Sequence, residues 1–122
     1  MTEKEIDLLL EKIEKRNDWI TNNDVTTPSL EDIQFEKAVL GSIIEYNELH
    51  TYLYKSLSEE SFIDLKHQKV MSAIIELFCI SAPLKVPNIS TELKEMNEYE
   101  FVGGQAFLDD LLTYSLINKK NE

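Results

Sequence analysis

The scarcity of glycine is the feature that most restricts what this chain can fold into. The 122 residues contain only three glycines, and two of them, Gly103 and Gly104, are adjacent. A glycine inside a helix costs roughly 1 kcal/mol relative to alanine, so a glycine-poor chain favours helices. The adjacent pair predicts a turn, either with positive φ or at a close helix approach. Gly41 lies in the apolar run AVLGSII at residues 38–44, where it predicts close approach of a neighbouring helix.

Apolar residues recur at helical spacing through most of the chain, and no alternating pattern typical of strands persists. Helices are predicted at residues 2–20, 29–46, 48–56 and 64–81, then from Pro87 through Met96, and last from the glycine pair to Leu116. Ser29 and Asp64 are suitable N-caps for two of them. The sequence therefore predicts an all-α fold, a compact orthogonal bundle of about five to seven helices.

Apolar and charged positions divide the longer predicted helices into inner and outer faces. Residues 29–46 are predicted to direct Ile33, Leu40, Ile43 and Ile44 inward, and Glu36, Lys37 and Glu45 outward. The helix at residues 64–81 is apolar over a wide arc and is predicted to be central. Its apolar residues are Leu65, Val70, Met71, Ile74, Ile75, Leu77, Phe78 and Ile80.

Composition divides the chain into four segments. Residues 1–20 are predicted to form an N-terminal helical arm, 21–28 a polar linker, 29–118 a helical domain and 119–122 a polar tail. Pro28 disfavours helix at Thr27, which makes the linker the best internal boundary. The arm carries an apolar stripe of Ile6, Leu9, Leu10 and Ile13. That stripe has two interpretations, since it could dock on its own domain or pair with another chain.

Charge and cysteine usage restrict the possible partners and compartment. The formal net charge is −11 and Arg16 is the single arginine, which argues against direct binding of a phosphate backbone. The acidity favours solubility, or alternatively an acidic face for a basic protein partner. The single Cys79 lies in an apolar run and is predicted to be a buried small hydrophobe. Without a disulfide or an apolar run of about 20 residues, the chain is expected to be cytoplasmic and free of membrane spans.

Signatures of catalysis are missing from the sequence. It contains no GxxxxGK[ST], CxxC, HExxH or GxSxG motif. Asp64 and His67 have acceptable ligand spacing, but only His50 remains as a second histidine and a metal site needs three or four ligands. We therefore interpret Asp64 as an N-cap and His67 as an early helix residue. No catalytic residue, metal or cofactor is predicted in this chain.

Two carboxylate pairs and a group of tyrosines have structural interpretations. The pairs are Glu59-Glu60 and Asp109-Asp110. Adjacent helical residues point about 100° apart, so neither pair converges on a substrate and both are interpreted as solvated faces. The nearby Tyr46, Tyr52 and Tyr54 favour the core or the domain surface first and a partner contact second.

Several short motifs follow one another along the chain: PSLE at 28–31, EKAVLGSII at 36–44, LSEESF at 57–62, His67, IIEL at 74–77, APLK at 82–85, ISTEL at 89–93 and VGGQAFL at 102–108. Their order resembles the N-terminal domain of DnaB-type replicative DNA helicases. The resemblance covers about residues 28–118. Lys85 stands where the family usually has an acid, and Asn97 where a glycine is common. The structural landmarks are Gly41, Phe62, Gly103, Gly104, Phe107 and Leu108.

The resemblance implies a helical domain that self-associates in the collar of a hexameric ring and contacts primase or, in some systems, a helicase loader. The ATP-driven motor of such a helicase lies in a separate C-terminal domain, so ATP and Mg would bind there. An alternative is a free-standing helical adaptor of the same fold that binds helicase or primase. We expect a dimer or higher oligomer, with candidate self-association residues Ile6, Leu9, Leu10, Ile13, Leu111 and Leu112.

Overall fold

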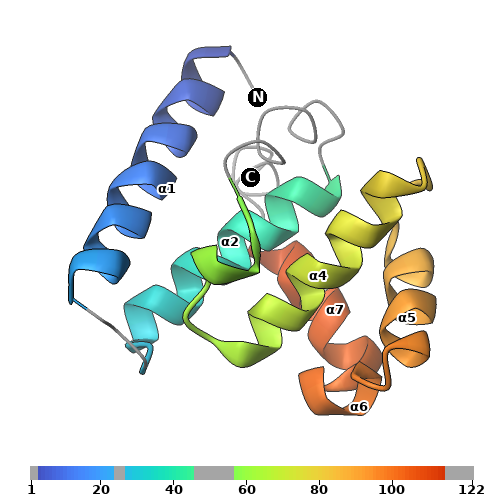
Figure 1. Cartoon of the computed structure of the whole chain (residues 1–122). Coiled ribbons are helices and arrows are strands. Elements are labelled where there is room, and N and C mark those ends of the chain that lie inside the picture. Colours follow the sequence, from blue (N-terminus) through green and yellow to red (C-terminus); the bar gives the residue numbers. More distant parts are fainter. Residues whose placement is uncertain (1–2, 24–26, 46–56, 115–122) are drawn as a thin grey trace.

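The computed structural model describes residues 3–23, 27–45 and 57–114 (Figure 1). Its elements are α1 (Glu3–Asn23), α2 (Leu30–Glu45), the 3-10 helix η1 (Glu59–Ser61), α4 (Leu65–Cys79), α5 (Val86–Glu95), α6 (Tyr99–Val102) and α7 (Gly104–Thr113). These ranges contain helices and no strand, so the predicted all-α bundle is confirmed. The predicted helix at 48–56, the three clustered tyrosines, His50 and the polar tail lie outside the described residues.

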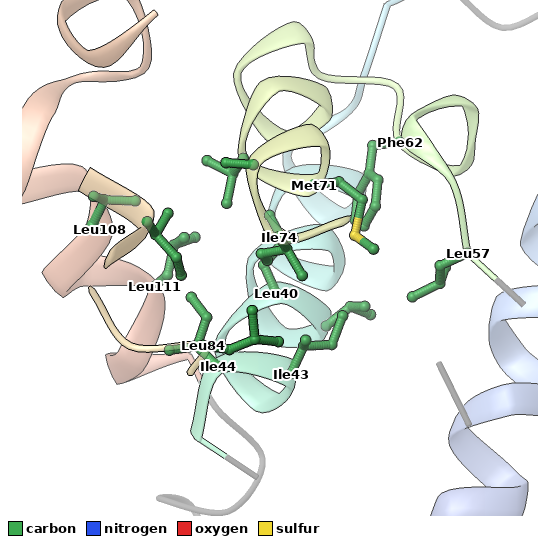
Figure 2. Packing of buried hydrophobic residues seen from close by; sticks show 14 of the residues in the cluster. Leu40, Ile43, Ile44, Leu57, Phe62, Met71, Ile74, Leu84, Leu108 and Leu111 are labelled. Carbon is green, nitrogen blue, oxygen red and sulfur yellow. The ribbon is translucent and has the colours of Figure 1, made fainter. Parts of the chain in front are cut away.

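The apolar core lies between α2, α4, α5 and α7. As predicted, α4 is central, since it packs against η1, α2, α5 and α6, while α7 packs against α2 and α5. Figure 2 shows Leu40 of α2, Ile74 of α4 and Leu108 of α7 gathered in the space between these helices. Leu40 and Leu108 have no exposed surface. Burying one leucine side chain fully stabilises a fold by about 1.5–3 kcal/mol, so this cluster carries much of the stability.

Local signals in the sequence start the helices at the predicted places. The Ser29 hydroxyl accepts from the Asp32 amide at 3.1 Å, and the Asp32 carboxylate accepts from the Ser29 amide at 3.0 Å. The Asp64 carboxylate accepts from the Lys66 amide at 2.8 Å and caps α4. Both predicted N-caps are confirmed. Pro87 lies in the first turn of α5, where a missing N–H has no cost to the helix.

Two of the described helices are followed by a non-glycine residue with left-handed backbone. Ser81 after α4 has a φ of 58°, and Asn97 after α5 has a φ of 61°. In each case an amide beyond the helix bonds back to its last turn, from Ala82 to the Leu77 carbonyl and from Glu98 to the Leu93 carbonyl, both at 2.9 Å. Asparagine tolerates this backbone better than most residues, which explains why it can replace a glycine at position 97.

The glycine pair forms the turn between α6 and α7. Gly103 has a φ of 112° and Gly104 a φ of 67°, so the predicted positive φ is confirmed. A Cβ added at Gly103 would lie 3.0 Å from the Cβ of Phe107, which leaves little room for a side chain. The sequence did not predict α6 as a separate helix. Gly41 lies buried within α2.

Three apolar positions at the ends of α4 differ from the sequence prediction. Cys79 is exposed, and Leu65 and Ile80 retain 59% and 62% of their accessible surface. The prediction of a buried Cys79 was therefore wrong, as was the assignment of Leu65 and Ile80 to the inward arc. The reason is position along the helix, because the ends of a central helix extend past the elements that cover its middle.

α1 stands along one side of the bundle (Figure 1). It continues to Asn23, three residues past the predicted end of the arm and into the predicted linker. Thr21 and the two asparagines that follow it are poor but permitted helix residues, whereas the first strong helix breaker is Pro28. Leu9 and Ile13 are buried, with 5% and 2% of their surface exposed, so this arm docks on its own chain.

Candidate functional site

The most unusual site in the described residues is a buried carboxylate, that of Glu36 on α2. It has no exposed surface and accepts bonds from three parts of the chain. The amides of Ile63 and Asp64 donate to it at 2.8 and 3.2 Å, and His67 Nδ1 lies 2.6 Å from Oε1. Arg16 of α1 completes the set through its Nη2. We call Arg16, Glu36, His67 and these two amides the Glu36 cluster.

The electrostatics of the cluster keep Glu36 ionised. Burial raises the pKa of the Glu36 carboxyl, but bonds from His67, Ile63 and Arg16, together with the charge of Arg16, outweigh burial and lower that pKa below its ordinary value. An ionised carboxylate can only accept, so the nitrogen of His67 that faces it carries the hydrogen. A carboxylate whose lone pairs are all engaged and that has no access to solvent is suited to holding helices together rather than to proton transfer.

Arg16 links α1 to this cluster through several contacts. Its Nη1 donates to the Ser61 carbonyl at 3.2 Å, and its guanidinium lies 5.3 Å from the ring centroid of Phe35. Its Nε lies 3.8 Å from an Asp32 oxygen and has no hydrogen-bond partner among the described residues. Burial alone would raise the pKa of the Asp32 carboxyl. The hydrogen bonds from Ser29 and the charge and hydrogen bond of Arg16 outweigh burial, so the pKa of Asp32 lies below its ordinary value.

The buried position of Glu36 corrects the prediction that this residue faces solvent. Its spacing contained the signal, because Glu36 lies three residues after Ile33 and four before Leu40, both predicted to face inward. Charge was given more weight than spacing, since a glutamate is rarely buried unless it is paired. The partners that make burial possible, Arg16 and His67, are 20 and 31 residues away along the chain.

His67 serves the same cluster and is not a surface residue. It lies between two of the landmark aromatic residues, stacked on Phe107 at 5.8 Å and edge-on to Phe62 at 6.5 Å between ring centroids. Asp64 lies three residues before His67, which is an acceptable spacing for two metal ligands, but its carboxylate caps the start of α4. Within residues 3–23, 27–45 and 57–114, no three His, Cys, Asp or Glu side chains lie together as a metal site would require.

The carboxylate pairs have separate roles in the structure. Glu59 and Glu60 are exposed in η1. Asp109 is also exposed and accepts from the Gln105 amide group at 2.9 Å. Asp110 bonds Lys37 at 2.9 Å and so joins α7 to α2. Asp109 and Asp110 therefore bind different partners. The Lys37 side chain, predicted to face outward, keeps only 18% of its surface exposed.

The described candidate self-association residues mostly lie inside their own chain. Leu9, Ile13 and Leu111 are buried, and Leu112 is partly buried against the core. The side chains of Ile6 and Leu10 lie outside the described residues. Two other apolar side chains of α1 are exposed instead, Leu8 at 51% and Trp19 at 52%. Leu8 and Trp19 do not belong to the predicted stripe of Ile6, Leu9, Leu10 and Ile13, so the apolar spacing did not identify them.

A second surface feature lies at the corner between α5 and α6. Lys94, Asn97, Tyr99 and Glu100 line an open hollow of about 430 Å³. The Lys94 ammonium lies 4.7 Å from the ring centroid of Tyr99. Phe101, on the same short helix, keeps 47% of its surface exposed. Exposed aromatic side chains of this kind can become buried anchors when a protein partner binds.

Comparison with known proteins finds one family and several relatives. Residues 28–121 match the family described as "DnaB-like helicase N terminal domain". The replicative DNA helicase DnaB of Rickettsia typhi is 34% identical over 113 residues, which cover 87% of this chain and 22% of that protein. The replicative DNA helicase DnaC of Bacillus subtilis is 30% identical over 89 residues, which cover 73% and 19%. The chain thus spans about a fifth of the length of these relatives.

Among the helices of residues 3–23, 27–45 and 57–114, none is both long enough and apolar enough to cross a bilayer.

Proposed function

The chain belongs to the family of DnaB-like helicase N-terminal domains, and on that premise we propose that it is the collar domain of a replicative hexameric DNA helicase. The observation that carries the proposal is the match over residues 28–121, with relatives that are themselves replicative helicases. The domain would serve assembly of the helicase and docking of primase or a helicase loader. The parent protein would act in the cytoplasm as an ATP-dependent DNA helicase.

The chemistry of this domain supports assembly rather than catalysis. The sequence lacks a phosphate-binding GxxxxGK[ST] loop, so ATP and Mg would bind the motor domain of the parent protein. A net charge of −11 opposes a tight grip on DNA by this domain alone. The Glu36 carboxylate, which has no exposed surface and accepts from Ile63, Asp64, His67 and Arg16, joins helices to one another. Binding of a partner protein would therefore involve exposed residues and not the buried Glu36 cluster.

The test of this proposal is a binding assay between the purified chain and the primase of the same cell, with the full-length helicase as second partner. We expect saturable binding to primase, and inhibition of primase-stimulated unwinding when the chain is in excess, with the basal ATPase of the helicase unchanged. Absence of binding to both primase and helicase would overturn the proposal.

The corner between α5 and α6 is the surface we propose for docking. Phe101→Ser is expected to weaken primase binding by about tenfold or more, because buried aromatic anchors dominate interface energies. Leu65→Ser is the matched control, since Leu65 is similarly exposed on another helix. Both variants should melt near the wild-type temperature. Equal binding by the two variants would remove the corner as the docking surface without touching the wider proposal.

A further inference from the structure

The attachment of α1 differs from the packing of the other long helices. α2, α4, α5 and α7 approach one another closely along their backbones, whereas α1 is not among the closely packed pairs of described helices. Its contact with the bundle is made by side chains, chiefly the buried Leu9 and Ile13 and the half-buried Arg16. A helix held through a few side chains can leave without disturbing the backbone packing of the rest.

The surface that receives α1 is apolar with one buried charge. Phe35, Glu36 and Val39 of α2, together with Leu57, Ser61 and Phe62, form what we call the α1 seat. A small void of about 10 Å³, roughly one water position, remains where Ile13 and Arg16 meet this seat. The apolar part of the seat covers Ile13, and its charged part binds Arg16.

The seat is assembled by residues outside α1. Glu36 keeps three of its four donors, the amides of Ile63 and Asp64 and the ring of His67, without any help from the arm. The side chains that meet Ile13 also belong to the bundle. An empty seat would therefore retain its shape and would present a carboxylate that lacks its cation. Leaving such a charge unpaired is costly, so the seat selects an occupant that brings a cation.

The occupant must carry a specific pattern. Leu9, Ile13 and Arg16 occupy positions i, i+4 and i+7 of one helix face. Arg16 is the only arginine in the sequence, and only a planar guanidinium could bond Glu36 and the Ser61 carbonyl while lying against Phe35. A second copy of this chain carries the identical helix. We propose that the α1 seat binds α1 of a second copy, so that two copies exchange their N-terminal arms through Arg16 and Glu36.

Mass action sets the conditions for this exchange. Residues 24–29 join α1 to α2, so the arm of the same chain competes at an effective concentration on the order of millimolar. Exchange is populated when copies are held close together or when their concentration approaches that value. The proposal concerns two copies of this chain and would stand even if the domain met neither a motor nor primase.

The first test uses a full chain whose own arm is disabled. Arg16→Glu leaves every seat residue unchanged. A labelled peptide of residues 3–23 is titrated with this variant and its fluorescence anisotropy is measured. We expect the wild-type peptide to bind at least about tenfold more tightly than a peptide that carries Arg16→Glu, since losing one partner of a buried charge pair is costly. The wild-type chain, whose seat is filled, should bind the peptide more weakly than the variant chain.

Matched controls separate the seat from general charge effects. Lys15→Glu makes the same change of charge at the neighbouring residue, whose side chain is 76% exposed. A peptide with Lys15→Glu should bind like the wild-type peptide. If the Arg16→Glu chain fails to fold, Ile13→Asp disables the arm at its apolar contact and leaves the seat equally intact. Equal binding of the wild-type and Arg16→Glu peptides to a folded chain with a disabled arm would overturn the proposal.

The second test measures exchange between full chains. Light scattering of the wild-type chain at rising concentration should show a dimer that is absent from Arg16→Glu and retained by Lys15→Glu. A dimer of unchanged stability in Arg16→Glu would contradict arm exchange. Because this readout involves no primase or helicase, its failure would leave the proposed collar function untouched, and loss of primase binding would leave arm exchange untouched.

Discussion

The apolar core and the Glu36 cluster stabilise the same fold by different physics. The core between α2, α4 and α7 is held by burial, which has no preferred direction and tolerates substitutions of similar volume. The Glu36 cluster depends on donors that must meet one carboxylate at 2.6–3.2 Å. Stability of the core therefore depends mainly on the volume that is filled, whereas stability of the cluster depends on each donor being in place, and the cluster also determines which surface α1 can occupy.

The two regions also differ in what they join. The core unites helices that already pack closely. The cluster brings together α1, α2, the turn that precedes α4 and α4 itself, because Arg16 and His67 bind Glu36 from 20 and 31 residues away along the chain. A polar junction that depends on distant partners is sensitive to the loss of any one of them. The comparison between burial and bonding can be tested one residue at a time.

Removing the central carboxylate should have the largest effect. Glu36→Leu preserves the approximate volume but leaves Arg16, His67 and two amides without their acceptor. We expect a loss of about 3–5 kcal/mol in the free energy of unfolding, measured by urea titration. Glu31→Leu on the exposed side of α2 is the control and should stay within about 0.5 kcal/mol of wild type. A loss below 1 kcal/mol for Glu36→Leu would mean that burial alone holds this region.

Truncating the core should cost somewhat less. Leu108→Ala removes a side chain with no exposed surface and leaves a cavity between α7 and its neighbours. We expect a loss of about 3 kcal/mol in the free energy of unfolding. Leu65→Ala, at a residue with 59% of its surface exposed, should change that free energy little. Equal stability of the two variants would contradict the placement of Leu108 in the apolar core.

A backbone change isolates the turn from side-chain contacts. Gly103→Ala removes no contact, yet it places a Cβ at a φ of 112° and 3.0 Å from the Cβ of Phe107. The expected loss is about 1–2 kcal/mol, measured by thermal unfolding. Gly103→Asn is the informative comparison, because asparagine adopts positive φ more readily. A stabilising Gly103→Ala would show that this turn does not need its left-handed backbone.

Acidification should have the smallest effect of the four changes on the free energy of unfolding, and it should act through Glu36. Burial raises the pKa of Glu36, but its bonds and Arg16 lower it overall below the ordinary 4.5. A carboxyl with a lowered pKa in the fold binds fewer protons folded than unfolded, so its contribution is present above about pH 4.5 and is lost as pH falls through the folded pKa.

One such group contributes a slope of at most about 1.4 kcal/mol per pH unit. Urea titrations between pH 3 and pH 6 should therefore show a steeper decline for wild type than for Glu36→Gln, in which position 36 cannot titrate. Asp32, whose pKa is also lowered, remains in both proteins and serves as the common background. Parallel declines would show that Glu36 does not titrate as its surroundings require.

Much of the helical architecture could be predicted because its signals are local. The hydroxyl of Ser29 and the carboxylate of Asp64 bond amides within three residues, and the backbone at Gly103 depends on a missing side chain. Both helix caps and the backbone at Gly103 depend on residues that are close together in the sequence. The family resemblance also depended on local motifs, and it holds over residues 28–121.

The candidate site could be predicted only in part. Phe62, His67 and Phe107 each belong to a motif of the sequence, but the stacking of His67 on Phe107 and its edge-on contact with Phe62 arise only when these three segments meet in the fold. Nothing in the sequence around Arg16, the single arginine, indicates that it binds Glu36. Cys79 was misplaced because apolar neighbours along a chain do not show where a helix leaves the bundle.

The amino-acid pattern was sufficient for the fold class, the helix starts and the family, because helical spacing, capping residues and short motifs are local features of the sequence. For the glycine pair it left two alternatives, a positive φ or a close helix approach. Folding in three dimensions was needed to bury Glu36 and to bring Arg16 and His67 to it. A buried charge is stable only when distant donors converge on it, and convergence is a property of packed helices rather than of any single segment.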